Sequence, residues 1–501
     1  MIRNAFQKQA ELRPDSVALI DRGERISFGS LASRKNAIAG YLAGKRRLAR
    51  GDLVAVALPN CWEFAASFLA VAELGAIFMP FNTHWRAREL DAFLPEFPPT
   101  LVITSRELRE PWDSLREILP QGCVISVDDP PVQEEFRTAS PPSSPRIPPE
   151  ELADDPVLYL ITSGSTGKPK VAPRSQRNLA AGVENVAQTL GVRPEMRFLS
   201  VVPFYHANGF SNCLLLPLLS GAAAVLAGRF SPVDLVETVR REKIQVLIGS
   251  PFIFRMLTER SAPRDAFSSV EICLSSGASM PAALPARCAG VLGLKVRQLY
   301  GSSEAGTISI EPAPGGQGGS DVGLPVKSVE IRILDGSGRI LAAGETGEIA
   351  VKGPAMMRGY AGQPGQDSRL FQDGLLRTGD LGRIDGRNHL ILCGRAKRLI
   401  NLSGVKVDPA EIEEVLLSHP SVRRCRVAGV RNPRGQELIK AVIAVRPSQR
   451  LSREQVVEHC RRRLSEYKIP RIIDFVETMP EDSSGKTPAA WPGEENELSE
   501  T

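Results

Sequence analysis

The sequence has little that could bind a transition metal. Its eight cysteines are scattered without a C-x-x-C pair, and its five histidines show no ligand spacing. Zinc and other structural or catalytic transition metals are therefore not expected. Scattered cysteines of this kind are more typical of free, buried thiols in a reducing compartment than of disulfides.

Long apolar runs are also missing. No stretch reaches the roughly 18 consecutive apolar residues that a membrane-spanning helix needs, and the first residues lack the apolar core of a signal peptide. The formal net charge is +5 over 501 residues, a weak bias that does not point to nucleic acid. These absences predict a soluble, cytoplasmic protein with no membrane span and no nucleic-acid partner.

What the chain does contain is a regular alternation of strand and helix patterns. Apolar strand patterns at residues 54–58, 76–80 and 101–104 are accompanied by helical patterns such as residues 63–74. This order predicts an α/β fold with mostly parallel sheets covered on both faces. From about residue 321, short strands and Gly turns predict a small β-rich subdomain. The last hundred residues, from about residue 396, read as a separate α+β domain.

The most informative stretch is residues 159–170, which read YLITSGSTGKPK. It continues an apolar, β-prone run that predicts a buried strand. Gly164 and Gly167 allow backbone N–H groups to converge, and hydroxyl side chains add further donors. Lys168 and Lys170 add positive charge. Converging hydrogen-bond donors and cations can bind a polyphosphate, and we predict a polyphosphate-binding site here.

Two better-known motifs do not fit this stretch. A Walker loop needs glycine five residues before its Gly-Lys pair and Ser or Thr after it, but Thr162 and Pro169 occupy those positions. Residues 165–168 match the S-x-x-K pattern of serine β-lactam enzymes. That motif lies on a helix, which Gly167 and Pro169 oppose, and neither S-D-N nor K-T-G follows. The remaining alternative is a surface turn. Surface turns rich in glycine and serine rarely both follow a buried strand and contain two lysines.

Five further residues have chemistry that a fold alone does not require. Glu304, in YGSSEAG, would be a natural Mg²⁺ ligand beside a polyphosphate. Asp380 follows a Thr-Gly turn and suits ribose hydroxyls, although an Asx turn is the alternative. Arg395 could pair with a phosphate or a ribose, or be a surface cation. His206 and Lys486 are weak signals when taken alone, because loop histidines are usually packed and loop lysines usually solvated.

In their order along the chain, these motifs resemble the adenylate-forming superfamily of acyl- and aryl-CoA synthetases, peptide-synthetase adenylation domains and beetle luciferases. The resemblance covers nearly the whole chain. It implies a large N-terminal adenylation domain (residues 1–396) and a small, mobile C-terminal lid (residues 397–501), joined by a hinge at residues 397–398. The motifs that carry it are residues 159–170, 300–306, 378–380, 394–395 and 404–413.

The resemblance implies two half-reactions. A carboxylate attacks the α-phosphate of ATP, giving an acyl-adenylate and pyrophosphate, and a thiol then takes the acyl group and releases AMP. The implied cofactors are ATP, Mg²⁺ and coenzyme A, or the phosphopantetheine of an acyl carrier protein. Glu304 would hold Mg²⁺, Lys486 would be the adenylation lysine, and His206 would lie between the carboxylate pocket and the pantetheine channel.

The other implied site residues fall into three groups. Those expected to bind ATP are Thr162, Ser163, Gly164, Ser165, Thr166, Gly167, Lys170, Gly277, Ala278, Tyr300, Gly301, Ser302, Ser303, Asp380 and Arg395. Tyr300, Gly277 and Ala278 would flank adenine, and Asp380 and Arg395 would hold the ribose. The candidates for the substrate pocket are Phe210, Phe252, Phe254 and Ser276, and those for the thiol channel are Ser403 and Gly404.

Departures from the family pattern narrow the choice of substrate. Amino-acid-activating relatives carry an aspartate in the segment after the phosphate loop, but residues 204–207 contain no carboxylate. A carboxylic acid with an uncharged fatty or aromatic tail is therefore favoured. Asn401 replaces a lysine of luciferases, and Arg398 replaces a hinge residue that is acidic in many relatives. Three hypotheses stay open: an acid–CoA ligase, a ligase that loads a carrier protein in a secondary-metabolite pathway, and an inactive relative that serves as a docking module.

Overall fold

The computed structural model divides the chain into two compact units. The first holds the described parts of residues 1–164, 168–331 and 351–376, and the second holds those of residues 332–350 and 377–501. The predicted domain boundary, between residues 396 and 397, lies outside the described residues and stays a prediction. The structure describes residues 1–115, 117–142, 147–162, 169–228, 231–260, 263, 265–278, 280–312, 319–362, 370–395, 400–402, 405–407, 409–431, 437–464 and 466–479.

A nine-stranded sheet is the larger of two sheets in the first unit. Its six central strands run parallel, and β2, β14 and β15 are antiparallel additions at its two ends. In sheet order the strands are β15 (Leu324–Pro325), β14 (Gly306–Ile310), β13 (Val296–Ser302), β12 (Ile272–Ser275), β11 (Val246–Gly249), β9 (Arg197–Ser200), β10 (Ala223–Leu226), β1 (Val17–Asp21) and β2 (Glu24–Ser27).

A six-stranded sheet completes the strand framework of the first unit. It is parallel except for its last pair, an antiparallel hairpin of β7 and β8. Its strands, in sheet order, are β6 (Val124–Ser126), β5 (Leu101–Thr104), β3 (Leu53–Ala57), β4 (Ile77–Pro80), β7 (Pro156–Thr162) and β8 (Lys170–Ser175). The predicted α/β class with mostly parallel sheets is confirmed.

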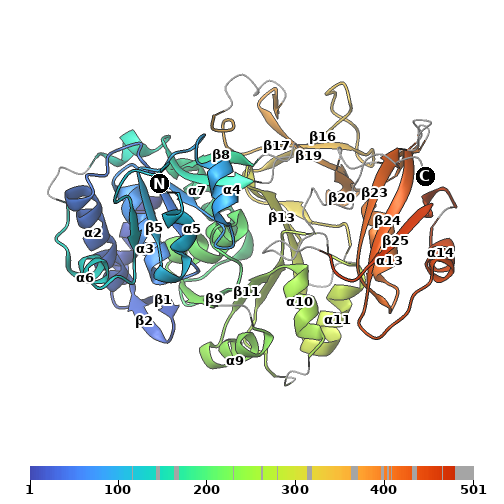
Figure 1. Cartoon of the computed structure of the whole chain (residues 1–501), viewed down its shortest axis with the longest axis horizontal. Helices are drawn as coiled ribbons and strands as arrows, with labels where there is room; N and C mark the ends of the chain where they lie inside the picture. Colours follow the sequence, from blue (N-terminus) through green and yellow to red (C-terminus); the bar gives the residue numbers. More distant parts are fainter. Residues whose placement is uncertain are drawn as a thin grey trace. The chain divides into compact units, whose positions relative to one another are not determined.

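Helices connect the parallel strands, as crossover connections require. Figure 1 shows α2 and α6 side by side at one flank of this unit. The helices are α1 (Ile2–Leu12), α2 (Phe28–Lys45), α3 (Trp62–Glu73), α4 (Ala87–Phe93), α5 (Glu110–Asp113), α6 (Pro130–Thr138), α7 (Gln176–Leu190), α8 (Leu216–Ser220), α9 (Pro232–Glu242), α10 (Pro251–Thr258) and α11 (Ala283–Leu292), with the 3₁₀ turns η1 (Arg106–Leu108) and η2 (Pro149–Leu152) and the π-helix η3 (Gly209–Leu215).

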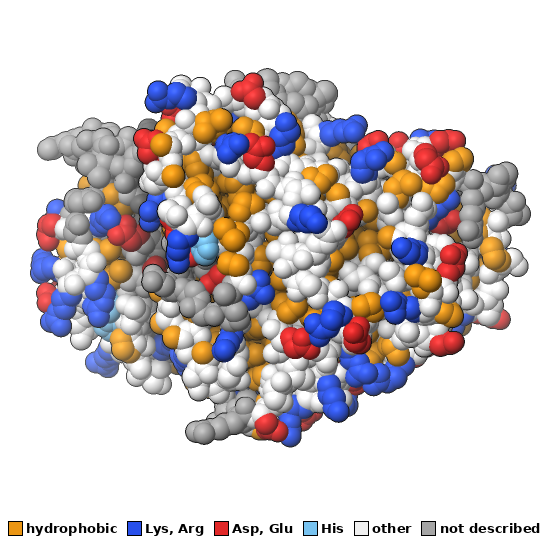
Figure 2. Space-filling view, turned by 180° about the vertical axis from the view of Figure 1, so that it is seen from behind, with side chains coloured by type: hydrophobic (Ala, Val, Ile, Leu, Met, Phe, Trp, Pro, Cys, Tyr) orange, Lys and Arg blue, Asp and Glu red, His pale blue; other side chains and the backbone are white. Residues whose placement is uncertain are grey.

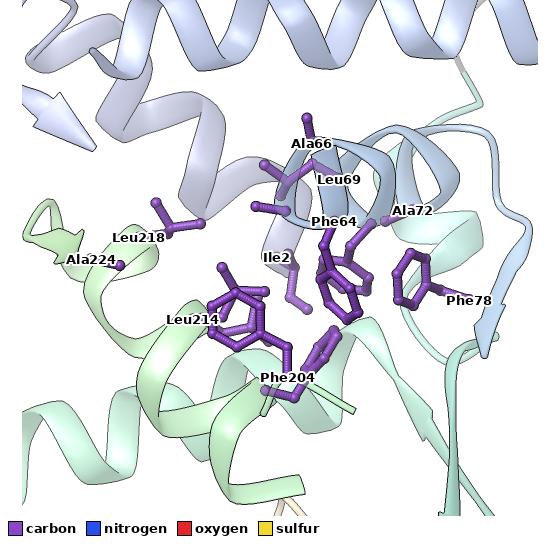
Figure 3. Close-up of a cluster of buried hydrophobic side chains, with 14 of the residues drawn as sticks. Ile2, Phe64, Ala66, Leu69, Ala72, Phe78, Phe204, Leu214, Leu218 and Ala224 are labelled. Atoms are coloured by element: carbon purple, nitrogen blue, oxygen red, sulfur yellow. The ribbon is translucent and has the colours of Figure 1, made fainter. Parts of the chain in front are cut away.

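An aromatic cluster ties the two sheets' connecting elements together. The rings of Phe68 in α3 and Phe210 in η3 meet edge to face with centroids 4.7 Å apart, and Phe64 lies 5.1 Å from Phe78 and 5.4 Å from Phe204. All five rings are at most 1% exposed, and Figure 3 shows Phe64, Phe78 and Phe204 converging. This packing anchors the loop that runs from β9 to η3 and carries His206.

The second unit is richer in strands. β17 and β19 belong to a five-stranded sheet, and a separate three-stranded sheet packs with α13 and α14. The elements that lie wholly or mostly in this unit are β16 (Glu330–Leu334), β17 (Gly347–Lys352), β19 (Leu375–Ile384), β20 (Leu390–Arg395), β21 (Ile400–Leu402), β22 (Val405–Val407), α13 (Pro409–Leu417), β23 (Val422–Arg431), β24 (Glu437–Val445), α14 (Arg453–Arg461), η4 (Glu466–Lys468) and β25 (Ile472–Val476). The short strand β18 (Phe371–Gln372) pairs with β19 but belongs to the first unit.

The charged surface side chains and the cysteines are distributed as the composition suggests. Figure 2 shows acidic and basic side chains interspersed over the visible face. All eight cysteines are free thiols, and six of them are buried. Among the described residues, every helix is too short or too polar to cross a bilayer.

Two buried carboxyl groups lie where β1 meets α3. The backbone N–H of Trp62 donates to Asp21 Oδ2 at 3.0 Å, and Glu63 is only 7% exposed. Burial raises the pKa of both carboxyl groups, and the negative charge of Asp21 further raises the pKa of Glu63 and favours its neutral form. Ionised Glu63 is therefore a destabilising feature of the folded unit.

We expect Glu63→Gln to stabilise the protein in a pH-dependent way. Because the folded pKa of Glu63 lies above its unfolded value, the penalty of ionisation is fully present above the folded pKa and disappears as pH falls toward the unfolded value. The variant's midpoint of urea unfolding should thus exceed that of the wild type at pH 8, and the two should converge near pH 4. Glu237→Gln, at an exposed position of α9, is the control; a constant difference at all pH values would contradict the assignment.

Candidate active site

The two ends of the predicted phosphate-binding stretch are paired with each other. Thr162, the last residue of β7, lies opposite Lys170, the first residue of β8, in the antiparallel hairpin. Both side chains are half-buried. The pairing fixes the start and end of the intervening segment side by side. Ser163, Gly164, Ser165, Thr166, Gly167 and Lys168 themselves lie outside the described residues.

One tyrosine, Tyr360, contacts both Lys170 and Glu304. The Nζ of Lys170 lies over the ring of Tyr360, 4.6 Å from its centroid. The hydroxyl of Tyr360 donates to Glu304 Oε1 at 2.7 Å. Burial, together with the charge and hydrogen bond of Glu304, raises the pKa of the Tyr360 hydroxyl far above its ordinary value, so this group remains a proton donor. The predicted phosphate-binding lysine and the predicted metal-binding carboxylate thus contact one aromatic side chain.

A buried arginine interacts electrostatically with the same carboxylate. Arg174, in β8, is 2% exposed. Its Nη1 donates to the carbonyl of Ser303 at 2.9 Å, and its Nη2 donates to the carbonyl of Ala355. Burial lowers the pKa of this guanidinium to about 10, while the negative charge of Glu304 opposes that shift. The charge of Glu304 therefore favours the buried cation.

The backbone around Glu304 needs glycine at two positions. Gly306 has φ +76°, and an added Cβ would lie 3.3 Å from Arg174 Nη2. At Gly301 a Cβ would lie 2.4 Å from the carbonyl oxygen of Gly306, which no relaxation of a side chain could relieve. The β13–β14 turn therefore closes tightly beneath Glu304. This explains why glycine flanks the acidic residue in the YGSSEAG motif.

The predicted adenine and pocket residues gather at one edge of the nine-stranded sheet. Ser276 and Gly277 follow β12, residues 300–302 end its parallel neighbour β13, and Ser303 comes directly after β13. Gly277 has φ +90°, Gly277 and Ala278 are exposed, and Tyr300, Ser302 and Ser303 are half-buried. The carboxyl ends of parallel strands are where open α/β sheets bind ligands. His206 follows β9 at the same edge, half-buried beside Tyr205 at a ring distance of 4.5 Å.

The aromatic pocket candidates differ in exposure. Phe210 and Phe254 are fully buried, each within a hydrophobic core cluster. Phe252 is half-buried, with the guanidinium of Arg255 over its ring at 5.6 Å, and Ser276 is 8% exposed. Phe252 and Ser276 are therefore the better placed of the four to meet a ligand, and a substrate-binding role for all four stays a prediction.

Asp380 lies in the second unit, in the middle of β19. It is 9% exposed, and its backbone pairs with that of Arg395 in β20. Its N–H donates to Thr378 Oγ1 at 3.1 Å, while Gly379 N–H donates to Glu348 Oε1 at 3.1 Å. The turn is thus held by side chains of the same unit, and the two predicted ribose-binding residues lie on adjacent strands. Ser403, Gly404, Lys486 and the hinge at residues 397–398 lie outside the described residues.

The sequence did not single out Arg174 or Tyr360. A signal for Arg174 was available, since it is a charged residue that follows apolar residues inside a short strand (KVAPRS). No local pattern pointed to Tyr360. It lies 56 residues from Glu304 in the sequence, and only the tertiary fold brings the two side chains into contact.

Comparisons with known proteins cover almost the whole chain. The family described as AMP-binding enzyme matches residues 6–361, and the one described as AMP-binding enzyme C-terminal domain matches residues 411–486. A feruloyl-CoA synthase from Amycolatopsis sp is 30% identical over 488 residues, covering 96% of each chain.

Solved structures agree with these matches. ATP-bound MatB from Rhodopseudomonas palustris superposes with a TM-score of 0.88 at 26% identity, covering 97% of both chains. The o-succinylbenzoate coenzyme A synthetase (MenE) from Bacillus subtilis, in complex with ATP and magnesium ion, gives 0.86 at 27% identity, covering 97% of this chain and 98% of that one.

Proposed function

The chain belongs to the AMP-binding enzyme family, and from this premise we propose that its site activates a fatty or aromatic carboxylic acid with ATP and transfers the acyl group to coenzyme A. It is an AMP-forming acid–thiol ligase. In the first step a carboxylate oxygen bonds to the α-phosphorus of ATP and the bond to pyrophosphate breaks. In the second, a thiol sulfur bonds to the acyl carbon, and AMP leaves.

The observation that carries this proposal is the contact of Lys170 and Glu304 with the same tyrosine, beside the ends of the phosphate stretch. An ammonium and a carboxylate held at one place suit a polyphosphate and its metal ion. Glu304 is half-buried and keeps a second oxygen beyond the one that Tyr360 contacts, so the donor set fits Mg²⁺ with ATP. When bound, Mg²⁺ would neutralise phosphate charge.

The remaining roles follow the family pattern and are part of the proposal. Residues 162–167 and Lys170 bind the phosphates, Gly277, Ala278 and Tyr300 flank the adenine, and Asp380 with Arg395 holds the ribose. Gly301, Ser302 and Ser303 complete the ATP-binding set. Lys486 neutralises the charge that develops between the reacting anions. The relatives support ATP as the nucleotide, since MatB and MenE are solved with it.

Acid-dependent exchange of labelled pyrophosphate into ATP tests the first half-reaction. We expect exchange with at least one member of a panel of ferulate-like, short-, medium- and long-chain acids, and none without acid or without Mg²⁺. The productive acid is then offered with free coenzyme A or with a phosphopantetheinylated carrier protein, and we expect thioester formation with coenzyme A. Transfer only to the carrier protein would favour the carrier-loading alternative. If no acid in the panel supports exchange, the hypothesis that the protein is an inactive relative serving as a docking module would be favoured.

A further inference from the structure

Tyr360 contacts two side chains of opposite charge through different parts of its own side chain. The Lys170 ammonium lies 4.6 Å above its ring centroid, and the Glu304 carboxylate accepts from its hydroxyl at 2.7 Å. A ring face attracts a cation, and a phenol hydroxyl donates well to an anion. One side chain therefore contacts both groups at once, the ammonium through its ring face and the carboxylate through its hydroxyl.

The backbone on both sides of Tyr360 is fixed to the elements that carry these charges. The N–H of Ala361 donates to the carbonyl of Val171 at 3.0 Å, and the N–H of Met357 donates to the carbonyl of Glu304 at 2.8 Å. Val171 adjoins Lys170 in β8. The ring is thus attached to the lysine-bearing strand on one side and to the glutamate-bearing loop on the other, and its position is set before any ligand arrives.

We propose that Tyr360 is a positioning residue that keeps the Lys170 ammonium and the Glu304 carboxylate apart and correctly oriented for Mg·ATP. This inference rests on the proposed function, because it assigns phosphate binding to Lys170 and metal binding to Glu304. Without the ring, the two side chains can pair directly. That ion pair would occupy both ligand-binding groups and would have to break before each nucleotide bound.

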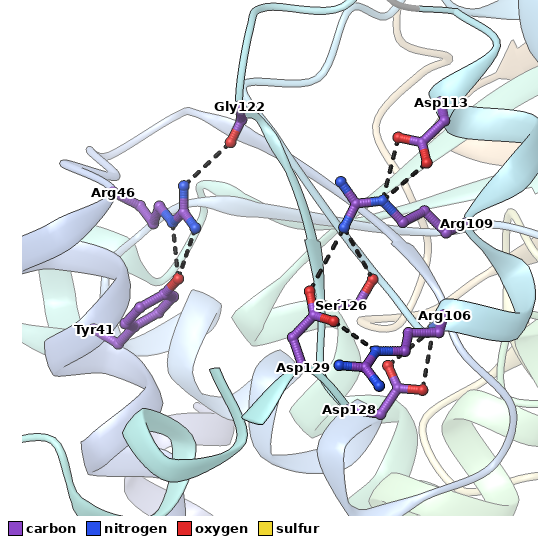
Figure 4. Close-up of polar contacts among 9 residues, drawn as sticks. All are labelled: Tyr41, Arg46, Arg106, Arg109, Asp113, Gly122, Ser126, Asp128 and Asp129. Atoms are coloured by element: carbon purple, nitrogen blue, oxygen red, sulfur yellow. Dashed lines mark hydrogen bonds and ion pairs between the residues drawn. The ribbon is translucent and has the colours of Figure 1, made fainter. Parts of the chain in front are cut away.

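The two halves of the side chain have separable roles. The hydroxyl orients the carboxylate, so Tyr360→Phe affects the metal-dependent part of binding and leaves Lys170 on its ring. Tyr360→Leu removes the ring as well, so it also affects the binding of the triphosphate without metal. Tyr41→Phe is a matched control, since Tyr41 is 5% exposed and its hydroxyl accepts from Arg46 Nε and Nη2 at 3.0 and 2.8 Å, in a network of structural contacts (Figure 4).

Calorimetric titration of the full chain with ATP, in EDTA or in excess Mg²⁺ and without acid, tests the assignment. We expect Tyr360→Phe to weaken Mg·ATP binding about 10-fold and to leave metal-free ATP binding unchanged, whereas Tyr360→Leu weakens both. The Mg²⁺ concentration for half-maximal pyrophosphate exchange should rise for Tyr360→Phe, while thioester formation from a synthetic acyl-adenylate should match the wild type. Tyr41→Phe should change none of these values.

Either of two binding results would overturn the inference: wild-type Mg·ATP binding by Tyr360→Phe, or equal effects of the phenylalanine and leucine variants on binding. Equal loss of exchange and thioester formation in Tyr360→Phe would indicate a merely structural role and would also overturn it. Failure of the proposed function is distinguishable, because the wild type would then show no exchange with any acid. If the wild type exchanges and Tyr360→Phe behaves like it, only the positioning role is wrong.

Discussion

Replacing Lys486 by alanine is expected to lower acyl-adenylate formation by at least about 100-fold, which is typical of losing one charge-stabilising group in a transition state. A carboxylate and a triphosphate repel each other, and an ammonium between them offsets that repulsion. The second half-reaction brings a thiol to a neutral acyl carbon and does not need this ammonium. Thioester formation from synthetic acyl-adenylate should therefore remain within a few-fold of the wild type.

The two half-reactions can be measured separately on the same preparation. Pyrophosphate exchange reports the first, and release of AMP from synthetic acyl-adenylate with coenzyme A reports the second. Lys440→Ala is a matched control, because Lys440 lies on β24 of the second unit and pairs with Asp474 at 3.1 Å. Equal loss of both half-reactions in Lys486→Ala would contradict the assigned role and would also argue against a lid that presents this lysine only for adenylation.

Replacing Glu304 by glutamine should affect both catalysis and stability. The amide oxygen can still accept from Tyr360, but the charge that would hold Mg²⁺ is gone, so we expect pyrophosphate exchange to fall by about 100-fold or more. The same change leaves the Arg174 guanidinium, which is 2% exposed, without the negative charge that favours it. Uncompensated buried charge is costly, and we expect a loss of unfolding free energy on the order of 1–3 kcal/mol.

A double-mutant cycle separates these effects. Arg174→Met alone removes the donors to the carbonyls of Ser303 and Ala355 and should be destabilising. Combined with Glu304→Gln it should cost less than the sum of the single changes, because each variant alone leaves the other's charge uncompensated. Urea unfolding of the four proteins measures the coupling. Additive stabilities would show that Arg174 and Glu304 do not interact in the folded protein.

The sequence patterns that predicted the fold share one property: each is contained in a short stretch of the chain. The β-prone run before residues 163–168 could be recognised as a strand because its residue types and period are local, and β7 (Pro156–Thr162) lies there. The alternation of strands and helices likewise predicted parallel sheets, because such connections leave few other topologies. Some local details could not be foreseen. Residues 209–215, for example, form the π-helix η3 and not a regular α-helix, directly after the loop that carries His206.

Most of the candidate site was named from motifs, but their mutual arrangement was not. Glu304 was predicted as a metal ligand from its residue type and neighbours, without any indication of which side chain would orient it. Phe210 and Phe254 were equally plausible as pocket or core from sequence, and the fold places both at 0% exposure. Hydrophobicity alone does not say which face of a buried aromatic meets a ligand, because core and pocket walls use the same residues.

The sequence by itself determined the α/β class, the family and the identity of the residues that could carry the chemistry, because strand periods, glycine turns and motif order are written in consecutive residues. The tertiary structure alone decided that Tyr360 contacts both Lys170 and Glu304, and that Arg174 reaches a carbonyl 181 positions away. Contacts over such separations depend on how the sheets and crossovers return the chain to one edge. No local sequence pattern predicts which distant segments meet at that edge, since their positions result from the packing of the whole unit.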